Sequence, residues 1–156
     1  MKKNKLLSTP RLFVQDFGVF PVDVLVAYGC PKEAVIEYLT KSKSSREFVK
    51  AIKNKLDAAS DGGVGGFTSF DGRRCFLWLD ATGDKFDLVV NLVHETNHMV
   101  LIGCQQKISG VGKGGELELE SAAYTQQYLF DSIFRKITGK GKIPKEDDVL
   151  ANLRKK

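Results

Sequence analysis

The segment at residues 92–100 reads LVHETNHMV and contains both histidines of this 156-residue chain. His94 and His98 are four residues apart, and residues with that spacing lie on one face of an α-helix. Their imidazole rings can therefore bind one ion, with Glu95 close enough to reach a water molecule on it. This H-E-x-x-H pattern predicts a zinc site in which the glutamate serves as a general base.

The residues around the motif are typical of a helix. Asp84 follows Gly83 and is a suitable N-cap, and the helix dipole favours acidic residues in the first turn. The helix around the motif carries almost no charge, because most of its positions are apolar: Leu88, Val89, Leu92, Val93, Val100 and Leu101. We expect a largely buried helix, in which two histidines and a carboxylate are costly unless they bind a ligand or pair. The short pattern also arises by chance in helices whose histidines only form hydrogen bonds.

Length and composition indicate one ordinary globular domain. The chain is 42% hydrophobic and 28% charged, and its 156 residues suffice for one core but not for two. No apolar run approaches the ~20 residues that span a bilayer, so we expect no membrane segment. Pro10 and Arg11 interrupt the N-terminal segment, which argues against an export signal. Cys30, Cys75 and Cys104 lack the spacing of a cysteine-based zinc site and are expected to be reduced thiols of a cytoplasmic protein.

The net charge of +5 lies mostly away from the motif. Residues 1–55 hold eleven Lys and Arg against five Asp and Glu, residues 56–115 hold five against seven, and residues 116–156 hold eight against seven. A basic flank can bind nucleic acid. No basic patch with interleaved aromatics accompanies it, so we expect a solvated surface and no nucleic-acid partner.

Hydrophobic periodicity predicts strands and helices on both sides of the motif. Strands are expected at residues 11–16, 19–28, 67–70 and 73–80, and the Asp71-Gly72 pair predicts that the last two form a hairpin. Helices are expected at residues 32–41, at 44–59, from 84 through the motif, and at 116–138.

The order of these elements predicts an α+β fold with a small, mostly antiparallel sheet packed on helices. We expect one domain at residues 11–138. A disordered lead-in is expected at residues 1–10, and a polar tail or short helix at residues 139–156.

A catalytic zinc site needs a third protein ligand and an open position for water. No third histidine exists, so a carboxylate from another helix should supply the ligand. Residues 116–124, ELELESAAY, offer three glutamates. Glu120 shares a helix face with Tyr124, whereas Glu118 points elsewhere and Glu116 lies one turn before Glu120. We select Glu120 and keep Glu116 as the alternative, although a first helical turn also favours acidic residues without any metal.

The motif, with Glu120 twenty-two residues after His98, resembles the gluzincin-type zinc metallopeptidases. The segment Glu120-Ser-Ala-Ala-Tyr124 is similar to a Glu-x-x-Ala-Tyr run in small phage and bacterial members. The resemblance covers residues 73–135 and implies a zincin-like fold, with residues 75–80 as the edge strand that binds extended substrate. The chain departs from the family at Tyr124, where many gluzincins place an aspartate. If Glu116 were the ligand, Glu120 would occupy that position.

The resemblance implies a zinc-dependent peptidase that acts on a peptide or protein substrate. Zn²⁺ on His94, His98 and Glu120 would activate water, and Glu95 would take its proton and pass it to the leaving amine. Tyr124 is a candidate donor to the developing oxyanion, as is Tyr128, although a tyrosine at either position more often packs in the core or supports a ligand by a hydrogen bond. The alternatives are a non-catalytic zinc-binding or protein-interaction module on the same fold and, third, a basic nucleic-acid-binding protein.

Overall fold

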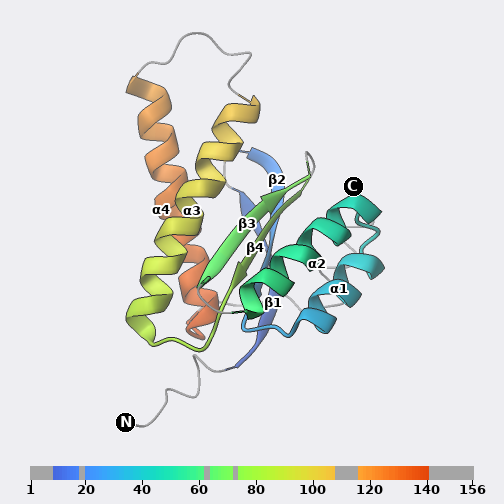
Figure 1. The fold of residues 1–156 in the computed structure, drawn as a ribbon. Coiled ribbons are helices and arrows are strands. Elements are labelled where there is room, and N and C mark those ends of the chain that lie inside the picture. Colours follow the sequence, from blue (N-terminus) through green and yellow to red (C-terminus); the bar gives the residue numbers. More distant parts are fainter. Residues whose placement is uncertain (1–8, 18–19, 62–63, 72–73, 108–115, 141–156) are drawn as a thin grey trace.

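The computed structural model describes residues 9–17, 20–61, 64–71, 74–107 and 116–140, and the side chains of residues 20–21, 102–107 and 116–121 lie outside this description. In the described part, a four-stranded sheet lies between two pairs of helices (Figure 1). The elements in chain order are β1 (Arg11–Phe17), β2 (Phe20–Tyr28), α1 (Lys32–Lys41), α2 (Arg46–Ser60), β3 (Gly66–Phe70), β4 (Arg74–Leu79), α3 (Lys85–Lys107) and α4 (Glu116–Ile137).

These elements confirm the strands and helices predicted from the sequence: every end that was predicted lies within two residues of the observed one, and α3 continues past the motif to Lys107. The α+β class is likewise confirmed. The predicted lead-in and tail lie outside the described residues, apart from residues 9–10 and 139–140.

The sheet is mixed, with the strand order β1-β2-β4-β3. β1 pairs antiparallel with β2, and β3 pairs antiparallel with β4, as the predicted hairpin requires. β2 and β4 are parallel neighbours, paired from Asp23 and Arg74 to Tyr28 and Leu79. A parallel pair needs a long connection, and here α1, α2 and β3 supply it.

The prediction that residues 75–80 form the edge strand is wrong. β4 lies between β2 and β3, and β3 is the edge strand next to the motif helix. The physical reason lies in the composition of β4, RCFLWL, whose side chains are mostly buried at successive positions. Such a continuous apolar run is typical of an interior strand that is covered on both faces.

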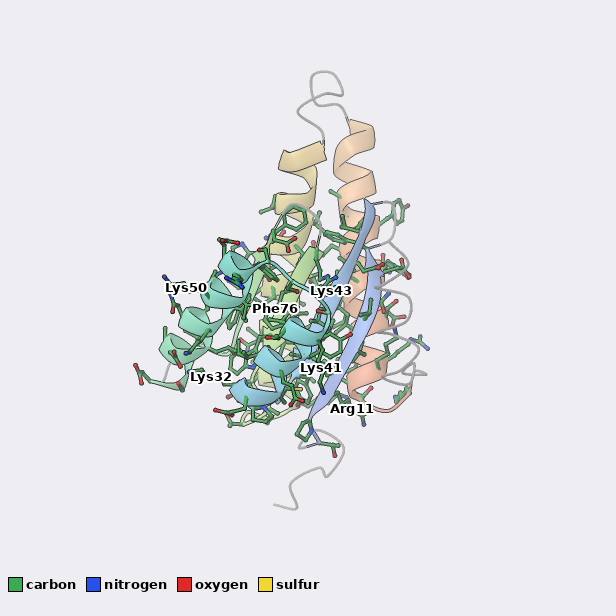
Figure 2. All side chains as sticks on the ribbon, turned by 90° about the vertical axis from the view of Figure 1, so that its right-hand side faces the viewer. Arg11, Lys32, Lys41, Lys43, Lys50 and Phe76 are labelled. Carbon is green, nitrogen blue, oxygen red and sulfur yellow. The ribbon has the colours of Figure 1, made fainter. Side chains whose placement is uncertain are left out.

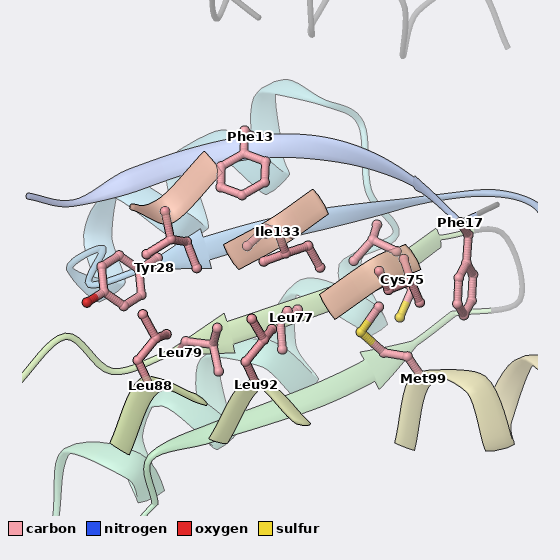
Figure 3. Packing of buried hydrophobic residues seen from close by; sticks show 14 of the residues in the cluster. Phe13, Phe17, Tyr28, Cys75, Leu77, Leu79, Leu88, Leu92, Met99 and Ile133 are labelled. Carbon is pink, nitrogen blue, oxygen red and sulfur yellow. The ribbon is translucent and has the colours of Figure 1, made fainter. Parts of the chain in front are cut away.

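Two hydrophobic clusters cover the two faces of the sheet. On one face, α1 and α2 pack through Val35, Leu39 and Ile52 against Leu25 and Phe76. On the other face, α3 and α4 pack against the remaining inward side chains of the strands (Figure 3): Phe13, Phe17, Val24, Val26, Tyr28, Cys75, Leu77 and Leu79. The sheet therefore holds α3 firmly along one side, which fixes the orientation of the motif.

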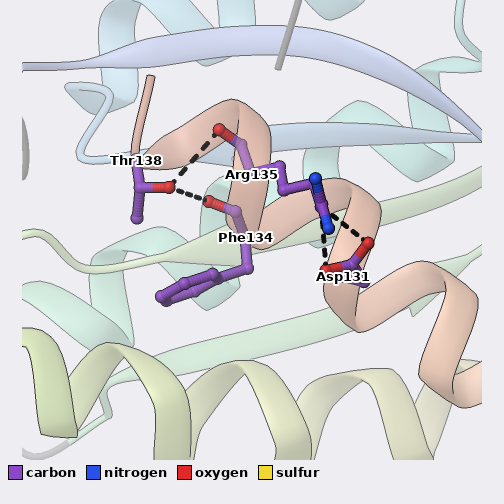
Figure 4. A network of polar contacts seen from close by, with 4 residues as sticks. All are labelled: Asp131, Phe134, Arg135 and Thr138. Carbon is purple, nitrogen blue, oxygen red and sulfur yellow. Dashed lines mark hydrogen bonds and ion pairs between the residues drawn. The ribbon is translucent and has the colours of Figure 1, made fainter. Parts of the chain in front are cut away.

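Local capping interactions determine where the helices begin and end. The Ser45 side chain accepts a hydrogen bond from Phe48 N at the start of α2. At the end of α4, Gly139 has φ of 76°, and Lys140 N donates to Arg135 O, which is the glycine-terminated arrangement that satisfies the last carbonyls. Figure 4 shows the same turn, where Thr138 Oγ1 donates to Phe134 O at 2.8 Å.

Candidate metal centre on helix α3

His94 and His98 meet on the outer face of α3. Their Nε2 atoms are 2.9 Å apart, and the rings meet edge to face with an interplanar angle of 84°. Two nitrogens on a tetrahedral zinc ion, each about 2.0–2.1 Å from the metal, are about 3.3 Å apart. The observed 2.9 Å is the length of a hydrogen bond between the two rings and is about 0.4 Å shorter than the zinc value, so the rings must open slightly before both nitrogens can bind one ion.

Both histidines are exposed, which corrects the expectation that they would be buried. The apolar residues of α3 cover two sides of the helix and not its whole circumference. Leu88, Leu92 and Met99 are buried against the sheet, while Val90 and Leu101 remain about half exposed. A helix at the outside of a layered domain keeps one face in solvent even when that face carries few charges.

Glu95 lies on a different side of the helix from its two neighbours in the motif. It is only 5% exposed, and it faces the edge strand β3. Thr68 Oγ1 donates a hydrogen bond of 2.6 Å to Glu95 Oε2. The buried carboxylate is therefore held by a polar partner, as a charged group in this position requires.

α4 contacts α3 from the side that carries Lys85, and one contact is to Val93, the residue directly before His94. Lys85 Nζ lies over the ring of Phe134, and Gln126 donates to Val93 O. His94 is nine residues after Lys85, which corresponds to a rotation of about 180° around the helix axis. The contacts at the start of α3 thus place α4 opposite His94.

The predicted third ligand, Glu120, lies in the first turns of α4, as do Glu116 and Glu118, but these three side chains are outside the described residues. Among the side chains that the structure does describe, no group of three or more His, Cys, Asp or Glu is placed to hold a metal ion. The described residues therefore offer two candidate ligands, His94 and His98, and the metal site itself remains a prediction.

The two tyrosines considered for an oxyanion site have different environments. Tyr124 is 70% exposed on α4. Tyr128 donates a 2.6 Å hydrogen bond to Asp16 and accepts one from Gln15. The bond to Asp16, followed by burial, raises the pKa of the Tyr128 phenol. Tyr128 thus joins α4 to β1, which favours a structural role for it.

A polar cavity at the start of α3 was not anticipated from the sequence. It has a volume of about 280 Å³, and Asp80, Asp84 and Asp87 contribute to its lining. Asp84 Oδ1 accepts hydrogen bonds from Phe86 N and Asp87 N, and Asp87 Oδ2 accepts one from Asp84 N. Two of these carboxylates thus cap the helix, and the cluster of acidic residues after β4 is the sequence signal that could have indicated the cavity.

The described part of the N-terminal half is nearly neutral. In residues 9–61 the sequence holds eight Lys and Arg against seven Asp and Glu, because Lys2, Lys3 and Lys5 lie outside the described residues. Figure 2 shows the labelled cations spread over α1, the turn after it, α2 and the start of β1. Lys41 pairs with Glu37 at 2.6 Å, and Lys32 pairs with Asp57. Arg46, Lys50 and Lys53 are exposed at helical spacing along α2.

No helix within the described ranges is both long and apolar enough to cross a membrane. Comparison with protein-family models, with curated proteins and with solved structures gives no match to this chain.

Proposed function

We propose that the chain is a zinc-dependent metallopeptidase in which His94 and His98 bind the ion and Glu95 is the general base. The observation that carries the proposal is the meeting of the two imidazoles on one exposed helix face, with their Nε2 atoms 2.9 Å apart, while Glu95 of the same motif is 5% exposed and faces β3. A catalytic site requires an open position, and an exposed histidine pair leaves space for water and substrate. Zinc at such a site supplies Lewis acidity, which lowers the pKa of water to about 7.

Glu95 is suited to proton transfer because its carboxylate is held in place. It would accept a proton from water as the water attacks the scissile carbonyl, and it would then donate that proton to the leaving amine. The burial of Glu95 beside β3 also limits competing water around the transferred proton.

The substrate is proposed to be a peptide in extended conformation. β3 is one of the two edge strands of the sheet and is the one that packs beside α3, so its outer edge can accept an additional strand. A peptide on this edge would pass close to Glu95, which contacts Thr68 in the middle of β3. The proposed substrate-binding strand is therefore β3 and not residues 75–80. An H-E-x-x-H helix beside an edge strand supports the proposal of a zincin-like fold.

Glu120 stays the proposed third ligand, with Glu116 as the alternative. The described turns of α4 lie opposite His94, so this assignment requires the first turns of α4, whose side chains are outside the described residues, to reach the histidine side of α3. Metal analysis by mass spectrometry of the wild type and of alanine variants tests the whole set. We expect about one zinc per chain, lost in His94→Ala, His98→Ala and Glu120→Ala and retained in Glu116→Ala. Glu118→Ala is the matched control, because it removes the same charge from the same helix turn. Absence of zinc from the wild type, even after zinc is added, would overturn the metal site.

Hydrolysis of a library of quenched fluorescent peptides tests the activity. Glu95→Gln keeps the size of the side chain but cannot accept the proton, so cleavage should be lost while zinc stays bound. Tyr124→Phe should lower kcat if its phenol donates to the oxyanion. A wild-type protein that binds zinc but cleaves no peptide would instead support the non-catalytic zinc module. The exposed pair with no third ligand among the described residues also fits that second function.

A further inference from the structure

Thr68 makes the polar contact that holds Glu95 in the structure. Its hydroxyl lies 2.6 Å from Glu95 Oε2 and 3.4 Å from the backbone oxygen of Glu95. A hydroxyl has one proton to donate, and the short distance to a charged acceptor assigns that proton to the carboxylate. The bond joins residues that are 27 positions apart in the chain, so β3 sets the orientation of a side chain on α3.

The backbone of β3 also packs against the side chain of Glu95, at Gly66. A Cβ atom at Gly66 would lie 3.2 Å from Glu95 Cγ, 3.0 Å from Trp78 O and 2.9 Å from the side chain of Leu79. The absence of a side chain at Gly66 therefore leaves the space that the stem of Glu95 occupies. Glu95 is packed at its stem and bonded at one of its two carboxylate oxygens.

The other oxygen, Oε1, accepts no hydrogen bond from the residues that the structure describes. A carboxylate with one fixed oxygen and one available oxygen is arranged for directed proton transfer. We infer that Thr68 is a positioning residue for the general base: it binds Oε2 and so presents Oε1 to the water that attacks the peptide. This inference rests on the proposed peptidase function, and it adds a residue outside the H-E-x-x-H motif to the machinery.

Thr68→Val is the direct test because valine has the same shape and suits a strand but has no hydroxyl. With the fluorogenic peptide that the wild type cleaves best, we expect kcat to fall about 10- to 100-fold, the effect of losing one hydrogen bond to a charged group. KM and zinc content should stay unchanged, because Thr68 Oγ1 is bonded to Glu95 and the proposed substrate pairs with the backbone of β3. Thr68→Ser keeps the hydroxyl and should restore most of kcat.

Thr96→Val is the matched control. Thr96 is fully buried on the same helix, and its hydroxyl donates to Leu92 O at 2.7 Å rather than to Glu95. The same substitution at Thr96 should leave kcat near the wild-type value. If Thr68→Val retained wild-type kcat while Glu95→Gln was inactive, the positioning role would be overturned although the peptidase function stood.

An NMR measurement on the metal-free protein tests the hydrogen bond between Thr68 and Glu95 independently of peptidase activity. In protein with ¹³C-labelled glutamate carboxyl groups, the NMR signal of Glu95 is the one missing from Glu95→Gln. That signal should move in Thr68→Val and stay in place in Thr68→Ser and Thr96→Val. An unmoved signal in Thr68→Val would refute the hydrogen bond itself. If the signal moves but the wild type cleaves no peptide, the positioning role falls together with the proposed function.

Discussion

The three ionisable residues of the motif, His94, Glu95 and His98, are close in sequence but lie in two different environments. His94 and His98 are exposed and meet each other, whereas Glu95 is buried and meets Thr68. Helical geometry explains the difference, because successive residues point about 100° apart around the axis. Position in the motif therefore determines the partner of each side chain.

Asp84 is a second residue whose local role can be tested. Its carboxylate accepts hydrogen bonds from Phe86 N at 2.6 Å and Asp87 N at 3.0 Å at the start of α3. Asp84→Ala should lower the free energy of unfolding by about 1 kcal/mol, the usual effect of losing an N-cap. Urea denaturation of the full chain measures the change.

Asp131→Ala is the control for Asp84→Ala, since it also removes one carboxylate from a helix. Asp131 forms an exposed ion pair with Arg135 (Figure 4), and its loss should change stability by no more than about 0.5 kcal/mol. Equal effects of the two substitutions would contradict the capping role of Asp84.

At the scale of elements, α4 is held to the sheet by a row of fully buried side chains. Leu129, Ile133 and Ile137 are each 0% exposed and belong to the cluster with Phe13 and Val26. The opposite side of α4 carries Tyr124, which is 70% exposed. α4 is therefore amphipathic with respect to this sheet, and its two sides should respond differently to truncation.

Ile133→Ala should destabilise the fold by about 2–5 kcal/mol, because it removes buried methyl groups and leaves a cavity. Tyr124→Ala should change the free energy of unfolding by less than about 0.5 kcal/mol. Thermal and urea unfolding followed by circular dichroism compare the two. A large loss of stability in Tyr124→Ala would show that Tyr124 is covered in solution.

At the scale of the whole molecule, the sheet places two thiols in the interior. Burial raises the pKa of Cys30 from 9.0 to about 11 and that of Cys75 from 9.0 to about 12. Backbone hydrogen bonds lower both values in part, and the charges of Asp71 and Glu95 add to the increase at Cys75. In the folded protein both thiols therefore stay protonated at pH values where an unfolded chain would ionise them.

This difference predicts that stability falls at alkaline pH. Both thiols are protonated in the folded and unfolded states below pH 9, so their stabilising effect is complete there and is lost as the pH rises toward the folded-state values. Each thiol should reduce the free energy of unfolding by up to about 1.4 kcal/mol per pH unit above pH 9. Urea denaturation between pH 7.5 and about 10.5, repeated on Cys75→Ala, tests this. A slope in Cys75→Ala as steep as that of the wild type would contradict the burial of an ionisable thiol at that position.

The sequence by itself determined the elements and the composition of the candidate site. Hydrophobic periodicity, the Asp84 cap and the glycine after α4 act within a few residues, so every end except the C-terminal end of α3 could be predicted to within two residues. The pairing of His94 with His98 could be predicted for the same reason, since their contact depends only on helical spacing.

Only the tertiary structure decided which strand lies at the edge, which side of α3 faces solvent, and that Thr68 meets Glu95. These features depend on how β2 and β4 pair across a long connection and on how α4 covers one side of α3. Local patterns contain no information about such partners, because an apolar strand or helix buries its side chains equally well against several neighbours. The residues of the motif could therefore be identified from the sequence, whereas the neighbours of each residue are set by contacts between distant segments.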